Sequence, residues 1–459
     1  MGRYVIILAA GKGTRMKSKL HKVLHSVAGK AMVEHVLDAA MKINPNEIIT
    51  VVGHGAQVVK EKIGERSSFA VQEEQLGTGH AVLQSKSFLS GKTGETLIIN
   101  GDTPLLTAET LQTLFDFHCK SKASATVLTA KVEDPTGYGR ILRDETGAVQ
   151  KIVEQKDVTA EEARLKEINT GVYVVGNEHL FSALAKLDIN NAQGELYLTD
   201  IIGILKSEGK VVSASQMSCF EESLGVNDRF ALAQANRILC ERINRFHMAN
   251  GVTLLDPAST YIESDVEIGQ DTVIEGNVSI KGKTKIGSEV FIGAGSEIVN
   301  SVLKDRTKVL RSVIEESILH EEADVGPFAY LRSKAELGKN VHVGNFVEIK
   351  AAKLGERTKA GHLAYVGNVD IGREVNLGAG VIFVNYDGKN KFQSQIDDYA
   401  FIGSNSDIVS PVHIGKNAIV AAGSTINENV PEDCLAMGRA RQVNKDGYAK
   451  RYNHYRQDE

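Results

Sequence analysis

The second half of this chain repeats an aliphatic residue at every sixth position, and that period restricts its fold more than any other feature. The repeat occurs in three runs: Ile262, Ile268, Ile274, Ile280, Ile286, Ile292 and Ile298; Val325, Leu331, Leu337, Val343 and Ile349; and Ile396, Ile402, Ile408, Ile414, Val420 and Ile426. A period of six fits neither a helix nor a strand alone, but it fits a short strand followed by a tight turn. One repeat cannot bury its own apolar face, so we expect stacked coils whose periodic side chains pack on one another. An ordinary β-sandwich with evenly spaced strands is the alternative.

The composition gives no indication of a nucleic-acid or membrane partner. A chain of 459 residues is expected to hold about two to four domains. Its net charge of −5 gives no general attraction to nucleic acid or to anionic lipid. No apolar stretch approaches the length of a membrane span, and residues 5–10 are too short for a signal peptide. Cys119, Cys219, Cys240 and Cys434 show no metal-like or redox-like spacing, which suits reduced thiols in a cytoplasmic protein.

The first half alternates strand and helix patterns, which predicts an α/β sheet. Strands are expected at residues 4–8, 48–52, 97–100, 125–132 and 171–175, with helices at 32–42 and 105–119. In such sheets ligands bind beyond the carboxyl ends of the strands. The side chains that follow the first and third of these strands are therefore the first candidates for a site.

A glycine-rich loop, residues 9–16, follows the first predicted strand. Backbone N–H groups in such a loop can hold a phosphate, and Arg15 and Lys22 can neutralise a polyphosphate. The loop is neither a Walker loop nor a dinucleotide-binding fingerprint, because both need glycine where Met16 stands. Without the two cations, a simple turn would explain the glycines equally well.

Asp102 lies just after the strand expected at residues 97–100. A carboxylate beside a phosphate-binding loop suits Mg²⁺, which takes oxygen ligands and shares them with substrate phosphates. The alternative is that Asp102 caps the helix that follows Thr103.

A change of pattern marks residues 228–249, where an amphipathic helix is expected. Its apolar residues are Leu232, Ala235, Leu239, Ile243 and Phe246. Asn227 or Asp228 is the expected cap at its start, and Gly251 stands where a glycine commonly ends a helix. We expect a semi-rigid spacer between two domains, with a coiled-coil dimer as the alternative.

Several motifs of the first half resemble those of the sugar-1-phosphate nucleotidyltransferases. They are Leu8-Ala9-Ala10-Gly11-Lys12-Gly13-Thr14-Arg15-Met16, Lys22-Val23-Leu24, Gln75-Leu76-Gly77-Thr78-Gly79-His80 and Gly101-Asp102. With the six-residue repeat behind them, the whole chain resembles the bifunctional bacterial N-acetylglucosamine-1-phosphate uridylyltransferases and glucosamine-1-phosphate N-acetyltransferases. That family makes UDP-N-acetylglucosamine, a precursor of cell-wall peptidoglycan.

The resemblance implies an α/β fold class with three parts. A Rossmann-like nucleotidyltransferase domain is expected at residues 1–227 and a linker helix at 228–250. A left-handed parallel β-helix of hexapeptide repeats, with a C-terminal tail, is expected at 251–459. The left hand rests on the resemblance alone, because crossover connections are otherwise right-handed.

The resemblance also implies a uridylyltransferase site for UTP, N-acetylglucosamine-1-phosphate and Mg²⁺. The uridine nucleotide is expected at Leu8, Ala9, Ala10 and Gly11, the uracil at Gln72, Gly77 and Thr78, and the sugar at Gly139, Glu154, Asn169 and Asn227. Arg15 and Lys22 are the expected catalytic cations, which meet the triphosphate and the leaving pyrophosphate. Asp102 and Asn227 are expected to hold Mg²⁺.

A second site, for glucosamine-1-phosphate and acetyl-CoA, is implied on the β-helix. Arg332 and Lys350 are expected at the phosphate, Tyr365 and Asn376 at the sugar, and Ala379, Asn385, Tyr386, Ser404, Ala422 and Arg439 at acetyl-CoA. His362 is the expected general base, because imidazole titrates near neutral pH and can accept the proton of the attacking amine. His320, His342 and His413 are assigned no role. No cysteine falls in the motif, which favours direct transfer over an acyl-enzyme.

Two other functions remain open at this point. One is a uridylyltransferase whose β-helix is non-catalytic and serves oligomerisation. The other is a non-enzymatic β-helical binding protein, which would show flat threonine ladders that these repeats lack. The resemblance implies a homotrimer, and flat-sided β-helices can pack around a common axis. The polar tail, with Tyr448, Tyr452 and Tyr455, is expected to be an arm that reaches a neighbouring subunit or a frayed end.

Overall fold

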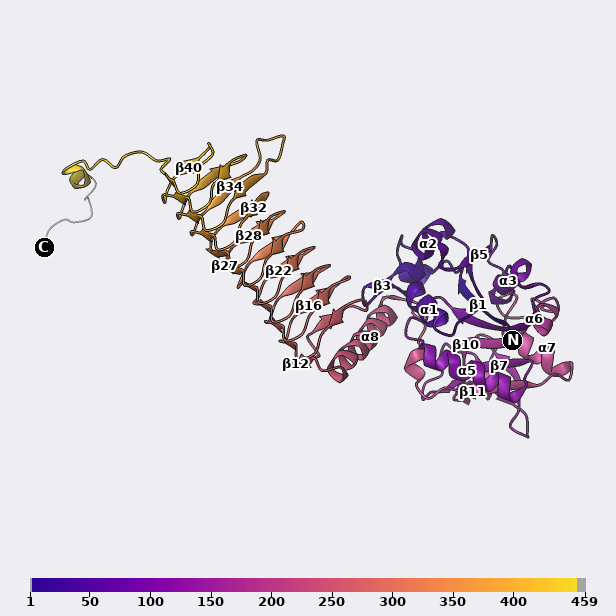
Figure 1. Ribbon diagram of the computed structural model, residues 1–459. Helices are drawn as coiled ribbons and strands as arrows, with labels where there is room; N and C mark the ends of the chain where they lie inside the picture. The colour runs from indigo at the N-terminus through magenta and orange to yellow at the C-terminus, as the bar shows by residue number, and fades with distance from the viewer. Residues whose placement is uncertain (1, 452–459) are drawn as a thin grey trace. The chain divides into compact units, whose positions relative to one another are not determined.

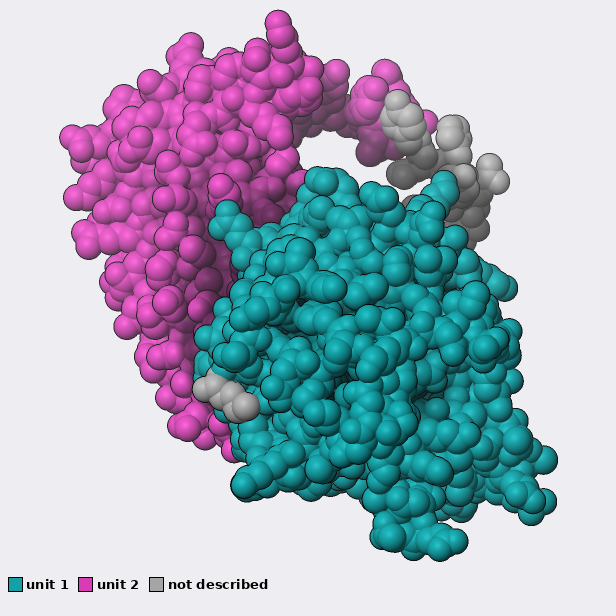
Figure 2. Space-filling view, turned by 90° about the vertical axis from the view of Figure 1, so that its right-hand side faces the viewer, with its two compact units in different colours: residues 1–240 teal, residues 241–459 magenta. Residues whose placement is uncertain are grey.

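The computed structural model describes residues 2–451. The chain divides into two compact units, residues 1–240 and 241–459, which Figure 2 shows in different colours. Tyr452 and Tyr455 of the tail lie outside the described residues. Within residues 2–451, no helix is both long enough and apolar enough to cross a bilayer.

A mixed β-sheet forms the centre of the first unit (Figure 1). Its main path is β11 (Val212–Gln216), β7 (Ala125–Lys131), β10 (Glu167–Gly176), β6 (Gly94–Asn100), β1 (Gly2–Ala9), β4 (Glu47–Val52) and β5 (Ser68–Val71). The five predicted strands are confirmed as β1, β4, β6, β7 and β10. Strands β6, β1, β4 and β5 are parallel, whereas β10 runs antiparallel between β6 and β7. Because Leu8 pairs with Asn100, the carboxyl ends of β1 and β6 lie side by side.

Helices pack on both faces of this sheet, because strand side chains alternate between the faces. Val5 and Ile7 of β1 belong to the apolar cluster that includes α1 (Met32–Met41) and α5 (Ala108–Ser121). Ile6 of the same strand belongs to the opposite cluster, with α6 (Asn177–Leu184) and α7 (Asp200–Ser207). Both predicted helices are confirmed, although α5 starts at Ala108. The hydroxyl of Thr107 caps α5 by accepting a hydrogen bond from the N–H of Thr110 at 3.2 Å.

The predicted amphipathic helix is present as α8 (Arg229–Ala249). Asp228 caps it, because its carboxylate accepts a hydrogen bond from the N–H of Ala231 at 2.9 Å. Ala235 and Ile238 are buried in an apolar cluster with Val226 and other residues of the first unit. The first half of α8 is therefore part of the first unit rather than a free spacer.

The second half of α8 packs on the second unit. Ile243 contacts the core of the β-helix, and buried Asn244 donates hydrogen bonds to the carbonyls of Pro257 and Thr260, each at 2.9 Å. Phe246 was predicted to lie on the apolar face of this helix because of its spacing. Its side chain is 64% exposed, so the prediction is wrong for this residue. The physical reason is that Ile243 and Asn244 make the contacts at this end of the helix.

The second unit is a left-handed parallel β-helix (Figure 1). Its strands form three sheets of 11, 10 and 9 strands, and each strand pairs in parallel with a strand of the next coil. One coil contains β27 (His342–Asn345), β28 (Glu348–Lys350) and β29 (Lys353–Leu354); the next contains β30 (Lys359–His362), β31 (Tyr365–Gly367) and β32 (Val369–Ile371). Ile262, Ile280 and Ile298 stack in register and are fully buried, which confirms the origin of the period.

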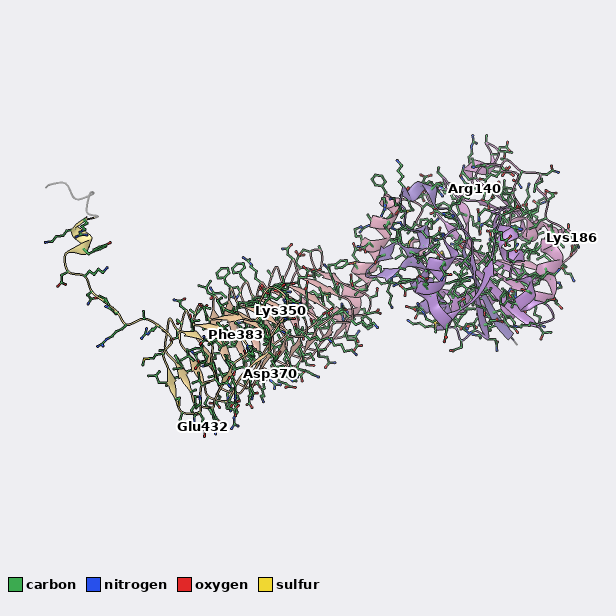
Figure 3. The ribbon with its side chains drawn as sticks, turned by 90° about the horizontal axis from the view of Figure 1, so that it is seen from above. Arg140, Lys186, Lys350, Asp370, Phe383 and Glu432 are labelled. Atoms are coloured by element: carbon green, nitrogen blue, oxygen red, sulfur yellow. The ribbon has the colours of Figure 1, made fainter. Side chains whose placement is uncertain are left out.

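Breaks in the period fall where a coil loses or gains residues between its inward side chains. Leu303 follows Ile298 after five positions instead of six, yet both are buried in the same core. The predicted insertion lies between β34 (Ile382–Val384) and β35 (Ser394–Ile396), where Tyr386 and Lys391 form an antiparallel bridge. Phe383, labelled in Figure 3, stays inside the coil just before this insertion.

Candidate functional site

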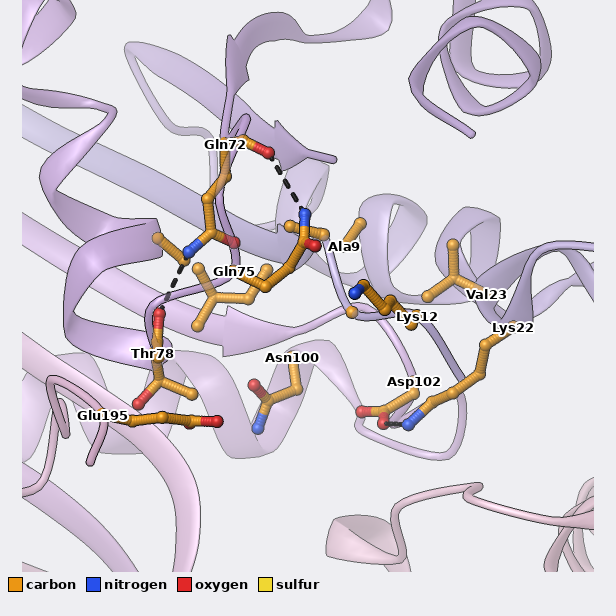
Figure 4. Close-up of a pocket in the computed structure, with 15 residues that line it drawn as sticks. Ala9, Lys12, Lys22, Val23, Gln72, Gln75, Thr78, Asn100, Asp102 and Glu195 are labelled. Carbon is orange, nitrogen blue, oxygen red and sulfur yellow. Dashed lines mark hydrogen bonds and ion pairs between the residues drawn. The ribbon is translucent and has the colours of Figure 1, made fainter. Parts of the chain in front are cut away.

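A pocket of ≈ 340 Å³ opens at the carboxyl end of β1 (Figure 4). The residues expected to bind the uridine nucleotide line it: Leu8, Ala9, Ala10, Gly11, Gln72, Gly77 and Thr78. Lys12, Gln75, Asn100 and Glu195 also line it, although the sequence analysis gave them no role. Lys12 and Gln75 could have been predicted, because both lie within motifs that the sequence already singled out. Glu195 could not have been predicted from the sequence, because it reaches the pocket from a distant loop.

Lys22 connects the two predicted metal ligands. Its ammonium group forms an ion pair with the carboxylate of Asp102 (Figure 4). The same group donates a hydrogen bond to Oδ1 of Asn227 at 2.8 Å. Arg15 donates to the same oxygen at 2.9 Å, although it is 212 positions away in the chain. The structure therefore brings together all four residues expected at the triphosphate and the metal. Asp102 is not a helix cap, because Thr107 caps α5.

The oxygen atoms of Asp102 and Asn227 fit a magnesium ion. A carboxylate oxygen and an amide oxygen already converge on one cation, the ammonium group of Lys22. Mg²⁺ is usually held by one or two carboxylates together with substrate phosphates and water. Within residues 2–451 no group of three or more His, Cys, Asp or Glu side chains is arranged to hold a metal. Asp102 and Asn227 would thus share the ion with oxygens that the protein does not supply.

The segment expected to contact uracil is held in place by a distant loop. The side chain of buried Gln72 donates a hydrogen bond to the carbonyl of Gly77 at 3.1 Å. Gly77 has a φ of 109°, and a Cβ there would lie 2.5 Å from the carbonyl oxygen of Leu196. The N–H of Leu198 donates to the hydroxyl of Thr78 at 3.0 Å. Glycine is therefore required at position 77 by backbone packing, whatever it contacts in a ligand.

A second pocket, of ≈ 280 Å³, adjoins the first at Leu8, Thr78, Asn100 and Asp102. The residues expected to bind the sugar line it: Gly139, Glu154, Asn169 and Asn227, with Tyr173 and Thr199 as further lining residues. The N–H of Asn169 donates to the carbonyl of Gly139 at 2.9 Å, and its amide donates to the hydroxyl of Tyr173 at 2.7 Å. These bonds join two segments of the pocket wall.

Carboxyl groups near this pocket hold their protons unusually tightly. Burial raises the pKa of Glu154, a side-chain hydrogen bond with Thr199 partly offsets this, and the charges of Asp200 and Asp157 raise the pKa further. Burial, together with Asp188 and Asp157, raises the pKa of Asp200 to about 6. Glu154 and Thr199 therefore offer this pocket neighbouring groups that can form hydrogen bonds with the hydroxyl groups of a sugar.

Four of the residues expected at acetyl-CoA, Ala379, Ser404, Ala422 and Arg439, lie along one corner of the β-helix. A column of equivalent positions in successive coils consists of Asn345, His362, Ala379, Ser404 and Ala422. The side chain of Arg439 donates to the carbonyl of Ala422 at 2.9 Å and so extends this column. Adjacent strands are about 4.8 Å apart, so the column is long and narrow. That shape suits an extended substrate such as acetyl-CoA.

Three of the residues expected at glucosamine-1-phosphate, Arg332, Lys350 and Tyr365, stand on the adjoining sheet. Arg332 of β25 (Tyr330–Arg332) and Lys350 are paired in register, so the two cations occupy the same position in successive coils. Glu348, which was not predicted, forms an ion pair with Arg332 at 2.8 Å. Tyr365 occupies the next coil at the position of Glu348, and buried Asn385 donates to its hydroxyl at 3.4 Å. Figure 3 labels Lys350 on this unit.

His362 is exposed at the end of β30, where its Nδ1 lies 2.7 Å from Oδ1 of Asn345. Asn376 stands on β33 (Asn376–Leu377), one coil beyond β30. Tyr386 lies in the insertion, where its hydroxyl donates to the carbonyl of Gly388 at 2.6 Å. Neither Asn345 nor Glu348 carried a signal in the sequence, because each meets its partner only when consecutive coils stack.

Both halves of the chain match known protein families. Residues 4–220 match the Nucleotidyl transferase family, and residues 265–300 and 393–428 match the Bacterial transferase hexapeptide (six repeats) family. Relatives named "Bifunctional protein GlmU" match nearly the whole chain. The protein of Enterococcus faecalis is 63% identical over 98% of both chains. That of Limosilactobacillus reuteri is 56% identical, and that of Listeria monocytogenes 54%, each over 98% of this chain and 99% of its own length.

The two family matches fall on the two units of the structure, and the relatives match both units in one alignment. They agree with a left-handed β-helix of hexapeptide repeats behind a nucleotidyltransferase sheet. The chain therefore belongs to the family of bifunctional GlmU proteins, enzymes that combine N-acetylglucosamine-1-phosphate uridylyltransferase and glucosamine-1-phosphate N-acetyltransferase activity.

Proposed function

We propose that the two activities of this enzyme of UDP-N-acetylglucosamine biosynthesis use separate sites, one in each unit. The corner column of the β-helix acetylates glucosamine-1-phosphate with acetyl-CoA. The two joined pockets beside β1 then transfer uridylyl from UTP to N-acetylglucosamine-1-phosphate and release pyrophosphate. The observation that carries the proposal is the convergence of Arg15, Lys22, Asp102 and Asn227 at the edge where the pockets meet.

Uridylyl transfer needs no nucleophile from the protein. A phosphate oxygen of the sugar phosphate attacks the α-phosphorus of UTP, and the bond to the β-phosphate oxygen breaks as pyrophosphate leaves. The main barrier is repulsion between anions, which Arg15 and Lys22 reduce, while Gln72, Thr78 and Glu154 hold the two substrates in position. Mg²⁺ bound at Asp102 and Asn227 would supply further positive charge at the phosphates.

Acetyl transfer requires the amine of glucosamine-1-phosphate to lose a proton. The amine nitrogen attacks the thioester carbonyl, the carbon–sulfur bond breaks, and coenzyme A leaves as its thiol after protonation. His362 accepts the proton that the nitrogen releases. Arg332 and Lys350 bind the phosphate of the sugar, and the column from Ala379 to Ala422 binds acetyl-CoA.

The test is a reciprocal pair of variants in the full-length protein. Asp102→Ala is expected to lower uridylyl transfer by about 10²-fold or more, because charge stabilisation worth several kcal/mol is lost, and to leave acetyl transfer unchanged. His362→Ala is expected to lower acetyl transfer by about 10²- to 10⁴-fold and to spare uridylyl transfer. Free thiol and pyrophosphate release measure the two reactions separately.

Asp116→Ala, which changes an exposed carboxylate on α5, is the control for the first variant. If Asp102→Ala keeps wild-type magnesium dependence, a different carboxylate holds the ion. If His362→Ala keeps full acetyl transfer, the β-helix has another base or serves only oligomerisation.

We further propose that the protein is a cytoplasmic homotrimer. Its four cysteines are free thiols, which suits a reducing compartment. Its β-helix presents three flat sheets, and such sides can pack in closed cyclic symmetry. Sedimentation equilibrium is expected to give three times the mass of one chain, and a monomer or dimer would refute the trimer.

A further inference from the structure

We propose that Asn345 is a positioning residue that holds His362 in the tautomer and orientation of a general base. The inference rests on the proposed acetyltransferase role of His362. Asn345 ends β27 and His362 ends β30, and the two residues are paired in register on successive coils. Their side chains leave the same corner and meet, with Oδ1 of Asn345 at 2.7 Å from Nδ1 of His362.

The backbone at this corner holds both side chains in place. The N–H of Leu363 donates to the carbonyl of Asn345 at 3.0 Å, which ties the two coils together beside the contact. Phe346 and Leu363, the residues that follow Asn345 and His362, have left-handed φ values of 57° and 50°. Both coils therefore turn in the same way at the same point, and the two side chains leave the corner in parallel.

The hydrogen bond decides which nitrogen of His362 can accept a proton. An amide oxygen only accepts hydrogen bonds, so Nδ1 of His362 must carry the hydrogen. In the neutral ring the lone pair is then on Nε2, on the side away from Asn345. When Nε2 takes the proton of the amine, Nδ1 keeps its hydrogen and Asn345 continues to accept it. The contact thus persists through the proton transfer.

Comparison with other histidines of the β-helix explains why this partner is an amide. His342 contacts Asp324 at 2.7 Å, and His413 contacts Asp397 at 2.8 Å. A carboxylate favours the imidazolium form, which cannot accept a proton. Asn345 orients the ring without that charge, and Ala379 on the next coil of the column is uncharged as well. His362 differs from these surface pairs in that its partner orients the ring and carries no charge.

Asn345→Ala tests the inference in the full-length protein. The kcat of acetyl transfer is expected to fall at least about 10-fold, and to remain above that of His362→Ala, because part of the 10²- to 10⁴-fold effect of a general base is lost. The KM values for glucosamine-1-phosphate and acetyl-CoA are expected to stay near those of the wild type. The denaturant midpoint of the second unit, followed by circular dichroism, reports that the β-helix is folded, and uridylyl transfer is expected to be unchanged.

Asn345→Asp provides the conservative rescue. Its carboxylate still accepts the hydrogen from Nδ1 but favours the imidazolium form, so kcat is expected to recover at high pH and to fall more steeply than in the wild type as pH decreases. Asp324→Ala is the matched control, since it removes the partner of another β-helix histidine at the same distance. It is expected to leave acetyl transfer unchanged.

The outcomes separate the inference from the proposed function. A normal kcat in Asn345→Ala, or a raised KM with normal kcat, overturns the positioning role while leaving His362 as the base. Equal losses in Asn345→Asp and Asn345→Ala at every pH overturn it too. Full acetyl transfer in His362→Ala instead refutes the proposed function of that histidine.

Discussion

At the residue scale, burial changes the pKa of Asp200, a carboxyl group for which nothing in the sequence predicts an unusual value. Burial and the charges of Asp188 and Asp157 raise the pKa of Asp200 from 3.8 to about 6. The folded protein therefore holds this proton more tightly than the unfolded chain, and stability decreases as pH rises through the interval between these values. Asp200→Asn, which keeps the shape and removes the charge, is expected to raise the free energy of unfolding of the first unit near pH 7.5, by at most about 3 kcal/mol.

Near pH 3 the two proteins are expected to be about equally stable, because this pH lies below both pKa values of Asp200 and its carboxyl group is largely protonated in both states. Urea unfolding at the two pH values measures the difference. Asp188→Asn serves as a graded comparison, since it removes one of the charges that act on Asp200, and its effect is expected to be smaller. An equal stabilisation by Asp200→Asn at both pH values would show that titration is not its cause.

At the scale of the element, two glycines on successive coils illustrate how closely the β-helix is stacked. A Cβ on Gly344 would lie 1.9 Å from the carbonyl oxygen of Gly361, whereas a Cβ on Gly361 would meet nothing within 4 Å. Gly344→Ala must separate the two coils and is expected to destabilise the second unit by at least about 2 kcal/mol. Gly361→Ala is expected to change its stability by no more than about 0.5 kcal/mol. Denaturant midpoints followed by circular dichroism compare them, and equal midpoints would contradict the stacking.

At the scale of the whole molecule, α8 determines where the chain can be divided. Ala235 and Ile238 complete an apolar cluster of the first unit, and Asn244 binds two carbonyls of the second. A fragment that ends at Ala249 is therefore expected to keep uridylyl transfer and to unfold at higher temperature than one that ends at Arg229. A fragment that starts at Glu241 is expected to keep acetyl transfer and to be more stable than one that starts at Gly251. Thermal melts with both assays test this, and identical melting temperatures within each pair would refute it.

The sequence by itself determined the architecture of both halves. The six-residue period can be read from the sequence alone, because each coil needs an aliphatic side chain at the position that points inward. The β-helix could therefore be predicted without knowledge of any tertiary contact. The strand that runs into the glycine-rich loop, and Asp102 at the end of β6, likewise follow from short-range patterns. Motif resemblance supplied the hand of the β-helix and the roles proposed for the two sites, which local physics does not contain.

Only the tertiary structure decided which side chains meet. Lys22 bridges Asp102 and Asn227, and Glu348 pairs with Arg332, because sheet edges and stacked coils bring distant segments together. Asn345 and His362 likewise meet only in the folded β-helix. They are one coil apart in the chain, and they become neighbours only when the two coils stack. The pKa of Asp200 and the exposure of Phe246 depend on burial in the same way. Burial and non-local contact belong to the packed chain as a whole, so no window of sequence encodes them.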